Sequence, residues 1–107
     1  MARIQRQQIT AIPATGFVSV LTPASGKKDE LLTLAIAAYG GTGLKFRPAL
    51  NLGGFELYLD EIPLATGVAG VCVSYTSIVV LAGQKLDIAQ VGVGTCFVTA
   101  TYMDVDV

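Results

Sequence analysis

The sequence has no histidine, no tryptophan and few charged residues. Histidine is the commonest general base and a common metal ligand, so its absence excludes imidazole-based catalytic triads and metal sites. The spacing of Ser25 and Lys28 matches a motif of acyl-transfer enzymes, but that motif requires a helix start, whereas these residues lie in a predicted turn. Glycine pairs at 41–43 and 92–94 precede no predicted helix and indicate turns rather than a phosphate-binding loop. We therefore expect a protein that is not an enzyme and binds no cofactor or metal.

Charge is scarce along the whole chain. Charged side chains make up 14% of the 107 residues, against about 25% in ordinary soluble domains, while apolar side chains make up 52%. So few charges cannot give a monomer of this size its usual ionic surface. Contacts between subunits are the simplest cover for the apolar remainder, so the composition predicts a homo-oligomer. The formal net charge of −1 argues against nucleic-acid binding, which needs a basic excess.

Signals for disulfides and membrane insertion are also weak. Cys72 and Cys96 form no Cys-x-x-Cys motif, and in a chain long enough to bury a core we expect free, buried thiols. Residues 62–84 carry no charge and are numerous enough to span a bilayer. They include Pro63 and several glycine and hydroxyl residues, which a lipid-facing helix would carry at a cost. We expect strands there and no membrane association, and no secretory leader is visible.

The spacing of turn residues predicts an all-β fold. The length suits one domain. Glycine and proline signals recur about every 8–12 residues and no helical repeat is present, which predicts about eight or nine short strands. This pattern is typical of a single-domain antiparallel β-sandwich or jelly roll. Residues 1–8 are too polar for the core, so we expect a polar N-terminal arm at 1–8 and the sandwich domain at 9–107.

Alternation of apolar and polar residues assigns faces to several strands. Leu44 and Phe46 alternate with charged residues, as do Leu86 and Ile88, and all four are predicted to face the core. Residues 31–39 are apolar on both faces and would also suit a helix, but their length and neighbours favour a strand buried on both faces. The clearest alternation lies at residues 55–60 and predicts three core residues and three outward residues: Phe55, Leu57 and Leu59 against Glu56, Tyr58 and Asp60.

The two chain ends carry opposite charges. Arg3 and Arg6 lie in the polar arm, whereas Asp104 and Asp106 lie beside the C-terminal carboxylate. These residues are either solvated ends or tails that meet oppositely charged neighbours in an assembly. The two aspartates share a strand face, where they would block strand pairing or bind a cation at a point where several copies converge.

The last predicted strand, residues 95–105, is apolar on both sides. One face can therefore line the core and the other can contact a neighbouring subunit. The alternating sets are Cys96, Val98, Ala100 and Tyr102 against Phe97 and Met103. The candidate partner contacts are Arg3, Arg6, Tyr102 and Asp104.

Three parts of the chain resemble small β-sandwich modules of tailed-phage virions. Residues 22–28 (TPASGKK), followed by residues 31–36 (LLTLAI), resemble the turn and strand that open many of these modules. Residues 79–88 (VVLAGQKLDI) resemble their strand–turn–strand, and residues 96–105 (CFVTATYMDV) resemble their final strand. The likeness covers most of residues 17–107.

The chain also departs from the pattern of these modules. Gln84 stands where they usually have aspartate, and Ala38-Tyr39 stands where asparagine commonly follows the strand. The ligand-binding roles of such modules are therefore not carried over to this sequence.

The resemblance implies a structural role in a virion. Modules of this type resemble the tumour-necrosis-factor-like jelly roll, which assembles as a trimer, and occur as capsid decoration (cement) proteins and as tail-fibre tips. A chain that starts at Met1 without a fibre shaft suits head decoration, with the major capsid protein as partner and assembly in the host cytoplasm. The reducing conditions of the host cytoplasm would keep both cysteines reduced. The alternative is a tail-fibre or baseplate module that recognises host saccharide, which exposed loop aromatics would favour.

Overall fold

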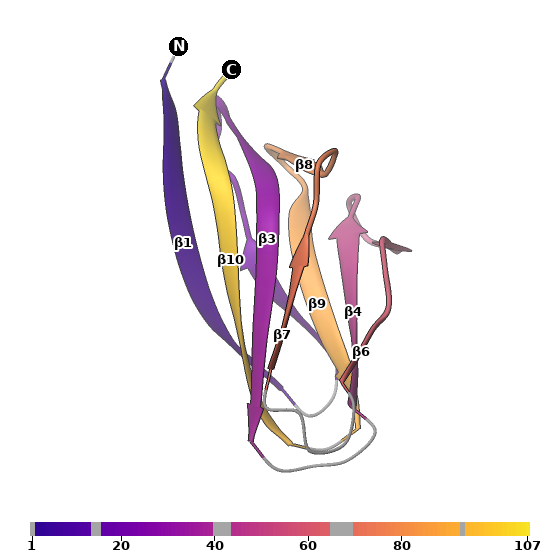
Figure 1. The fold of residues 1–107 in the computed structure, drawn as a ribbon. Coiled ribbons are helices and arrows are strands. Elements are labelled where there is room, and N and C mark those ends of the chain that lie inside the picture. The colour runs from indigo at the N-terminus through magenta and orange to yellow at the C-terminus, as the bar shows by residue number, and fades with distance from the viewer. Residues whose placement is uncertain (1, 14–15, 40–43, 65–69, 93) are drawn as a thin grey trace.

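All regular secondary structure in the described part of the chain is β. The computed structural model describes residues 2–13, 16–39, 44–64, 70–92 and 94–107 (Figure 1). Three of the ten strands have only three residues, which is why the sequence predicts fewer. In chain order, the strands are β1 Arg3–Ile12, β2 Phe17–Leu21, β3 Lys27–Tyr39, β4 Leu44–Asn51, β5 Glu56–Tyr58, β6 Ile62–Leu64, β7 Gly70–Ser74, β8 Val79–Leu81, β9 Lys85–Val91 and β10 Thr95–Asp106.

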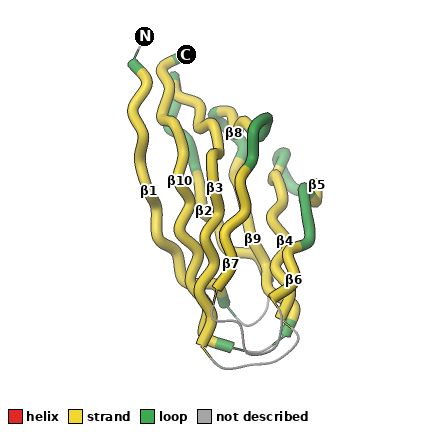
Figure 2. The backbone as a smooth tube through the Cα atoms, in the orientation of Figure 1, coloured by secondary structure: helices red, strands yellow, loops and turns green. Residues whose placement is uncertain are grey.

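The strands form two antiparallel sheets that face each other. One sheet has the order β1-β10-β3-β7, with β8 also paired to β3, and contains both chain ends; we call it the terminal sheet. The other has the order β2-β9-β4-β5, with β6 also paired to β4, and we call it the middle sheet. The chain crosses from sheet to sheet several times, as the tube in Figure 2 shows, which is the connectivity of a double-sheet jelly roll. The predicted β-sandwich is confirmed.

Strand β3 resolves the ambiguity of residues 31–39 in favour of a strand, but only its core face is buried, so the expected burial of both faces is wrong for the single chain. It is 13 residues long and lies between β10 and β7, so both of its edges are hydrogen-bonded. A register shift opposite Thr101 and Tyr102 leaves Leu32 without a partner in β10. Because of this bulge, the side chains that face the core switch from even-numbered positions (Leu34 and Ile36) on one side of it to an odd-numbered position (Leu31) on the other.

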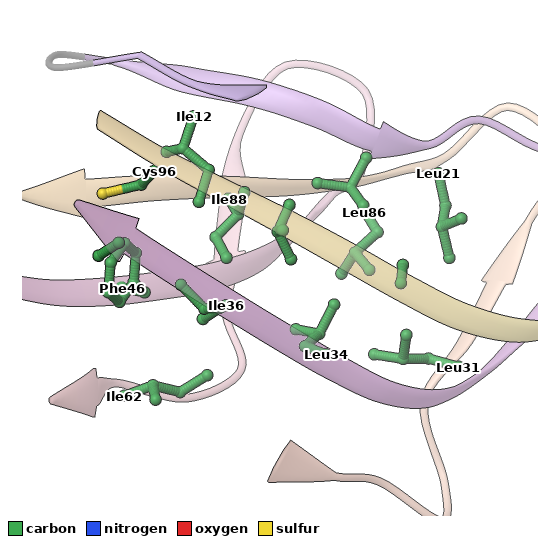
Figure 3. Close-up of a cluster of buried hydrophobic side chains, with 14 of the residues drawn as sticks. Ile12, Leu21, Leu31, Leu34, Ile36, Phe46, Ile62, Leu86, Ile88 and Cys96 are labelled. Carbon is green, nitrogen blue, oxygen red and sulfur yellow. The ribbon is translucent and has the colours of Figure 1, made fainter. Parts of the chain in front are cut away.

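The core is the layer between the two sheets. The sequence correctly places Leu44, Phe46, Leu86 and Ile88 there, and Cys96, Val98 and Ala100 of β10 lie with them. Figure 3 shows Phe46 and Ile62 of the middle sheet near Ile36 of the terminal sheet. Side chains from both sheets therefore form one continuous apolar cluster, as a sandwich requires.

The burial predicted for residues 55–60 is only partly correct: Tyr58 and Asp60 are exposed as predicted, but two of the three expected core residues are exposed as well. Phe55 is 61% exposed and Leu57 is 47% exposed, and only Leu59 packs against the core cluster. Leu57 pairs with Leu50 and so has the expected facing, but β5 is a three-residue strand at the open edge of the middle sheet. The hairpin before it turns at Gly53 and Gly54, which have φ of +92° and +122°. Alternation gives the side of a sheet but not whether another sheet covers it.

Residues 3–8 of the predicted polar arm are instead part of a strand. From Arg3 onward the chain forms β1, which pairs in continuous register with β10 from Arg3 opposite Val105 to Ile12 opposite Cys96. The two chain ends therefore lie side by side, as Figure 1 shows. Polarity excludes these side chains from a core, but an edge strand needs only its backbone to pair.

The uncharged stretch at residues 62–84 contains β6, β7 and β8. Within the part of the chain that the structure describes, no helix is long and apolar enough to cross a membrane. Of the two glycine pairs, 41–43 lies outside the described residues, as does Val93. Gly92 has a φ of +121°, which favours glycine at the turn that the sequence predicts there.

Candidate interaction surfaces

The outer face of the terminal sheet carries no charge over three cross-strand rows. On β3 and β10 the alternate residues are buried in the core, so the residues of these rows point away from it, and their partners on β1 and β7 share this side. We call these rows the uncharged face. From edge to edge they are Ala11–Phe97–Ala37–Gly70, Ile9–Thr99–Ala35–Cys72 and Gln7–Thr101–Thr33–Ser74. Most of these side chains are small, so the face is flat, and Ile9 and Phe97 stand out as large exposed apolar groups.

A shallow depression of about 430 Å³ lies in the uncharged face, between Phe97 and Cys72. It forms beside Gly70, which brings no side chain to the surface. A Cβ at Gly70 would lie 2.9 Å from the carbonyl oxygen of Ile36, so only glycine fits without movement of the backbone. The lining is apolar apart from Thr99 and the Cys72 thiol. Such a surface suits shape-complementary contact with another apolar surface.

The outer face of the middle sheet is ionic. Arg47 donates to Glu61 at 3.0 Å, and Lys45 lies 3.5 Å from the same carboxylate. These contacts lower the pKa of Glu61, with the hydrogen bond from Arg47 as the main cause. The rings of Phe17 on β2 and Tyr58 on β5 extend from opposite edges of the sheet and lie close together, with their centroids 5.9 Å apart. We call the outward surface of the middle sheet the ionic face.

A polar cluster lies beside this aromatic pair on the ionic face. Asp87 is buried and accepts hydrogen bonds from Ser19 at 2.8 Å and from Asn51 at 3.3 Å. Asn51 also donates to Glu56 at 3.2 Å. Burial and the neighbouring Asp87 raise the pKa of Glu56 to about 7. The hydrogen bonds from Ser19 and Asn51 join the two carboxyl groups in one polar network.

No metal site emerges from the described residues. No three histidine, cysteine, aspartate or glutamate side chains among residues 2–13, 16–39, 44–64, 70–92 and 94–107 are grouped so that they could hold an ion. The minority hypothesis of a cation bound by Asp104 and Asp106 concerns several converging copies, and it stays a prediction.

The four candidate partner contacts lie at the end of the terminal sheet that contains both chain termini. Arg6 donates to Asp104 at 2.9 Å, and Arg3 donates to Glu30 at 2.7 Å. Tyr102 lies one row from Asp104 on β10, directly opposite Arg6 on β1. The structure therefore brings these residues together, and the opposite charges of the two termini meet within one chain. Their role in binding a partner stays a prediction.

A buried carboxyl group adds to this end of the sheet. Asp29 is 6% exposed and lies directly across from Asp104 in the register of β3 and β10. Burial, and to a lesser degree the charge of Asp104, raises the pKa of Asp29 to about 6. Burial also raises the pKa of Tyr102. The sequence gives no signal for this pair, because it depends on which residues two distant strands bring into register.

Two exposed aromatic residues lie at the edge of the middle sheet, of which the sequence predicts only Tyr58 to face outward. Phe55 and Tyr58 are both exposed, and Tyr58 borders a depression of about 400 Å³. The depression is also lined by Arg47, Asp60 and Glu61. Asp60 accepts a hydrogen bond from the hydroxyl of Tyr75 at 3.2 Å. A possible signal is the pair Gly53-Gly54, which marks a hairpin whose following strand is too short to be covered.

Both cysteines are free thiols, as the sequence predicts, but only Cys96 is buried. Burial raises the pKa of the Cys96 thiol. Cys72 is exposed on the uncharged face, so the expectation that it is buried is wrong for the single chain. It faces away from the core because β7 pairs it with Ala35, one residue out of phase with the buried side chains of β3.

Comparison with known proteins adds no relative: neither a protein-family model nor a curated protein matches the sequence.

Proposed function

We propose that this chain is a structural module that assembles into a homo-oligomer through its uncharged face, and that it decorates a phage head. The assembly is a trimer and its partner is the major capsid protein, as the resemblance of the sequence implies. The role needs no catalytic group. It needs one surface for neighbouring subunits and another that remains compatible with water.

The uncharged face is the observation that supports this proposal. It spans four strands and three rows without a charged side chain, in a chain that has 15 charged residues to distribute. Phe97 lies in the outer row of this face, beside the depression at Gly70. Aromatic side chains are enriched in protein interfaces, and charged residues are depleted at the core of an interface.

Oligomerisation can be tested with two matched lysine variants. Phe97 on the uncharged face is 38% exposed, and Val91 on the ionic face is 40% exposed, so lysine at either position is tolerated by the single chain. We expect Phe97→Lys to reduce the mass in sedimentation to about one third of the wild-type mass, whereas Val91→Lys keeps the full mass. Wild-type protein that sediments as a monomer at micromolar concentration and above would contradict the proposal.

The virion role needs a separate experiment. Immunogold electron microscopy of purified phage particles with an antibody against the protein should place the label in a regular pattern over the head. Label on the tail would favour the receptor-binding alternative. Particles that carry no label on either part would exclude both virion roles.

A second candidate function is saccharide recognition at the edge of the middle sheet. Tyr58 offers an exposed ring beside a depression of about 400 Å³, which also presents Arg47, Asp60 and Glu61. An aromatic face that stacks on a sugar ring, with nearby carboxylates that accept from hydroxyl groups, is a suitable arrangement for saccharide.

Glycan-array binding, followed by titration of any hit, tests this candidate. Tyr58→Ala should abolish binding, because the ring borders the depression. Phe55→Ala is the matched control, since Phe55 is equally exposed but does not line it. An array without any hit, or equal affinity of both variants, would remove saccharide recognition from consideration.

A further inference from the structure

The outer edge of β1 is an open row of backbone hydrogen-bonding groups. In the terminal sheet β1 is the outermost strand, and within the described residues β10 is the only strand that pairs with it. The amide of Asp106 donates to the carbonyl of Ala2 at 3.1 Å, so residues 2 and 106 form a hydrogen-bonded pair. In an antiparallel ladder such pairs alternate along the strand. Because the register has no shift, the even-numbered residues of β1 bond to β10 and the odd-numbered ones point outward.

Five residues therefore present a free N–H and a free C=O at this edge: Arg3, Gln5, Gln7, Ile9 and Ala11. Proteins usually protect such an edge with a proline, a bulge, a short strand or an unpaired charge. Strand β1 has ten residues, contains no proline, and pairs with β10 without a bulge. Its two charges are already paired within the chain, Arg3 with Glu30 and Arg6 with Asp104.

The other sheet edges are far less suited to pairing. Strand β7 has five residues and β5 has three. Strand β2 also has five, and its register with β9 shifts between Ser19 and Leu21. Among the described strands, β1 is therefore the long, regular and unprotected edge.

We propose that two copies of this chain pair through the open edges of β1, antiparallel, across a two-fold axis at Gln7. In this register Gln7 lies opposite Gln7 of the second copy, Gln5 opposite Ile9, and Arg3 opposite Ala11. All five outward residues then exchange their N–H and C=O groups, and the two terminal sheets become one continuous sheet.

The register follows from two requirements. An antiparallel pair must place outward-pointing residues opposite one another, so the register can shift only in steps of two residues. A shift in one direction, with the axis at Arg6, pairs fewer outward residues and places Arg6 directly against Arg6 of the other copy. Like charges in direct opposition are destabilising. A shift in the other direction, with the axis at Gln8, also pairs fewer of them. Only the axis at Gln7 pairs all five outward-pointing residues and places no like charges opposite each other.

This contact uses the backbone edge of β1, whereas the proposed function uses the side chains of the uncharged face, although Gln7, Ile9 and Ala11 belong to both. A two-fold contact of this kind doubles the unit that the sheet faces form when the assembly closes with dihedral symmetry. Loss of the face contact through Phe97→Lys and loss of the edge contact are therefore separate measurements, and either can fail while the other holds.

A proline at the axis provides the first test. The N–H of Gln7 points outward, so Gln7→Pro leaves the bonds between β1 and β10 intact and proline is tolerated at such an edge. The expected result is a twofold fall in the sedimentation mass of the assembly at unchanged circular dichroism. Gln8→Pro removes an in-chain hydrogen bond instead and should lower thermal stability. A Gln7→Pro variant that folds and keeps the full mass would contradict the proposal.

Cysteine crosslinking tests the register and does not depend on the proline variant. In a background with Cys72→Ser, Gln7→Cys places two thiols opposite each other with Cα atoms about 5.5 Å apart, which a disulfide spans. In Gln5→Cys the two thiols are four residues out of register, roughly 13 Å apart, which no disulfide spans. Mild oxidation should give a covalent dimer of the Gln7 variant alone. Efficient dimerisation of the Gln5 variant would overturn the register, and a monomeric Gln7 variant would overturn the pairing itself.

Discussion

The two outer faces of this sandwich have opposite chemistry although both are built from antiparallel strands. The uncharged face has three complete rows without a charge, whereas the ionic face carries Lys45, Arg47, Lys85 and the polar cluster around Asp87. The 15 charged residues fall into two groups: eight at the terminal end of the terminal sheet and seven on or beside the middle sheet. The shortage of charged residues is therefore confined to one surface, the uncharged face.

This distribution refines the argument from composition. A uniform shortage of charge would leave apolar patches everywhere and would promote unspecific association. A shortage confined to one face leaves the other faces hydrated and gives association a direction. The difference between the faces thus explains how a chain with 52% apolar residues can form a defined assembly.

The largest expected effect separates the inner and outer sides of the terminal sheet. Leu34 and Ala35 are neighbours on β3, but Leu34 is fully buried in the core and Ala35 belongs to the uncharged face. Leu34→Ala should lower the free energy of unfolding by about 2–5 kcal/mol, because it leaves a cavity. Ala35→Ser should change it by no more than about 0.5 kcal/mol. Urea unfolding in a background with both Phe97→Lys and Gln7→Pro measures both without a contribution from dissociation, and equal losses would refute the assigned facing.

Sequence patterns predict the inner side of the sandwich well and its outer surfaces poorly. The alternation at Leu44 and Phe46 identifies core residues because the terminal sheet covers the inner side of their strand, β4. The same pattern fails at Leu57, where the strand lies at an uncovered edge. The polar side chains at the N-terminus predict an arm, but they do not reveal that the C-terminal strand offers a backbone partner.

The candidate surfaces depend on register, which a single sequence does not contain. The uncharged face exists because residues near 9, 35, 72 and 99 are brought into one row by three strand pairings. The juxtaposition of Asp29 with Asp104 has the same origin. Each strand taken alone looks ordinary, and only the pairing of strands distant in sequence creates the pattern.

The second prediction concerns the pH dependence of the charged end of the terminal sheet. The pKa of Asp29 rises from 3.8 to about 6 on folding, mainly through burial. Between these values the folded chain binds more protons than the unfolded chain, so stability falls as the pH increases through this window. Asp29→Asn should remove this dependence and stabilise the protein above pH 6, by at most about 3 kcal/mol. Urea unfolding at acidic and neutral pH measures it, with the exposed Asp60→Asn as control.

An Asp29→Asn variant that is no more stable than wild type at neutral pH would show that Asp29 stays ionised at little cost. The carboxyl pair on the ionic face would then dominate the pH dependence, because the pKa of Glu56 is also raised, to about 7. Glu56→Gln distinguishes the two pairs, since its effect should extend to higher pH than that of Asp29→Asn.

The third prediction uses the two thiols as reporters of the two sides of the terminal sheet. Cys96 is buried and burial raises its pKa, so it should react with a thiol reagent only after unfolding. Cys72 is exposed on the single chain but lies in the uncharged face. Assembly through that face should therefore slow its reaction by about tenfold or more, and Phe97→Lys should restore the fast rate. Equal Cys72 rates in the two proteins would mean that the face is open in solution.

The smallest effect is expected on the ionic face. Arg47 and Glu61 form an exposed ion pair, and such pairs add little to stability because water and salt screen them. Because Arg47 lowers the pKa of Glu61, the contribution is present above the ordinary pKa of glutamate and is lost as the pH falls. Arg47→Ala should thus leave the unfolding midpoint and the oligomer mass almost unchanged, with no difference from wild type at about 1 M salt. Lys85→Ala, at an exposed position on the same face, is its control. Dissociation caused by Arg47→Ala but not by Lys85→Ala would show that the ionic face also takes part in assembly, and the contrast between the two faces would have to be abandoned.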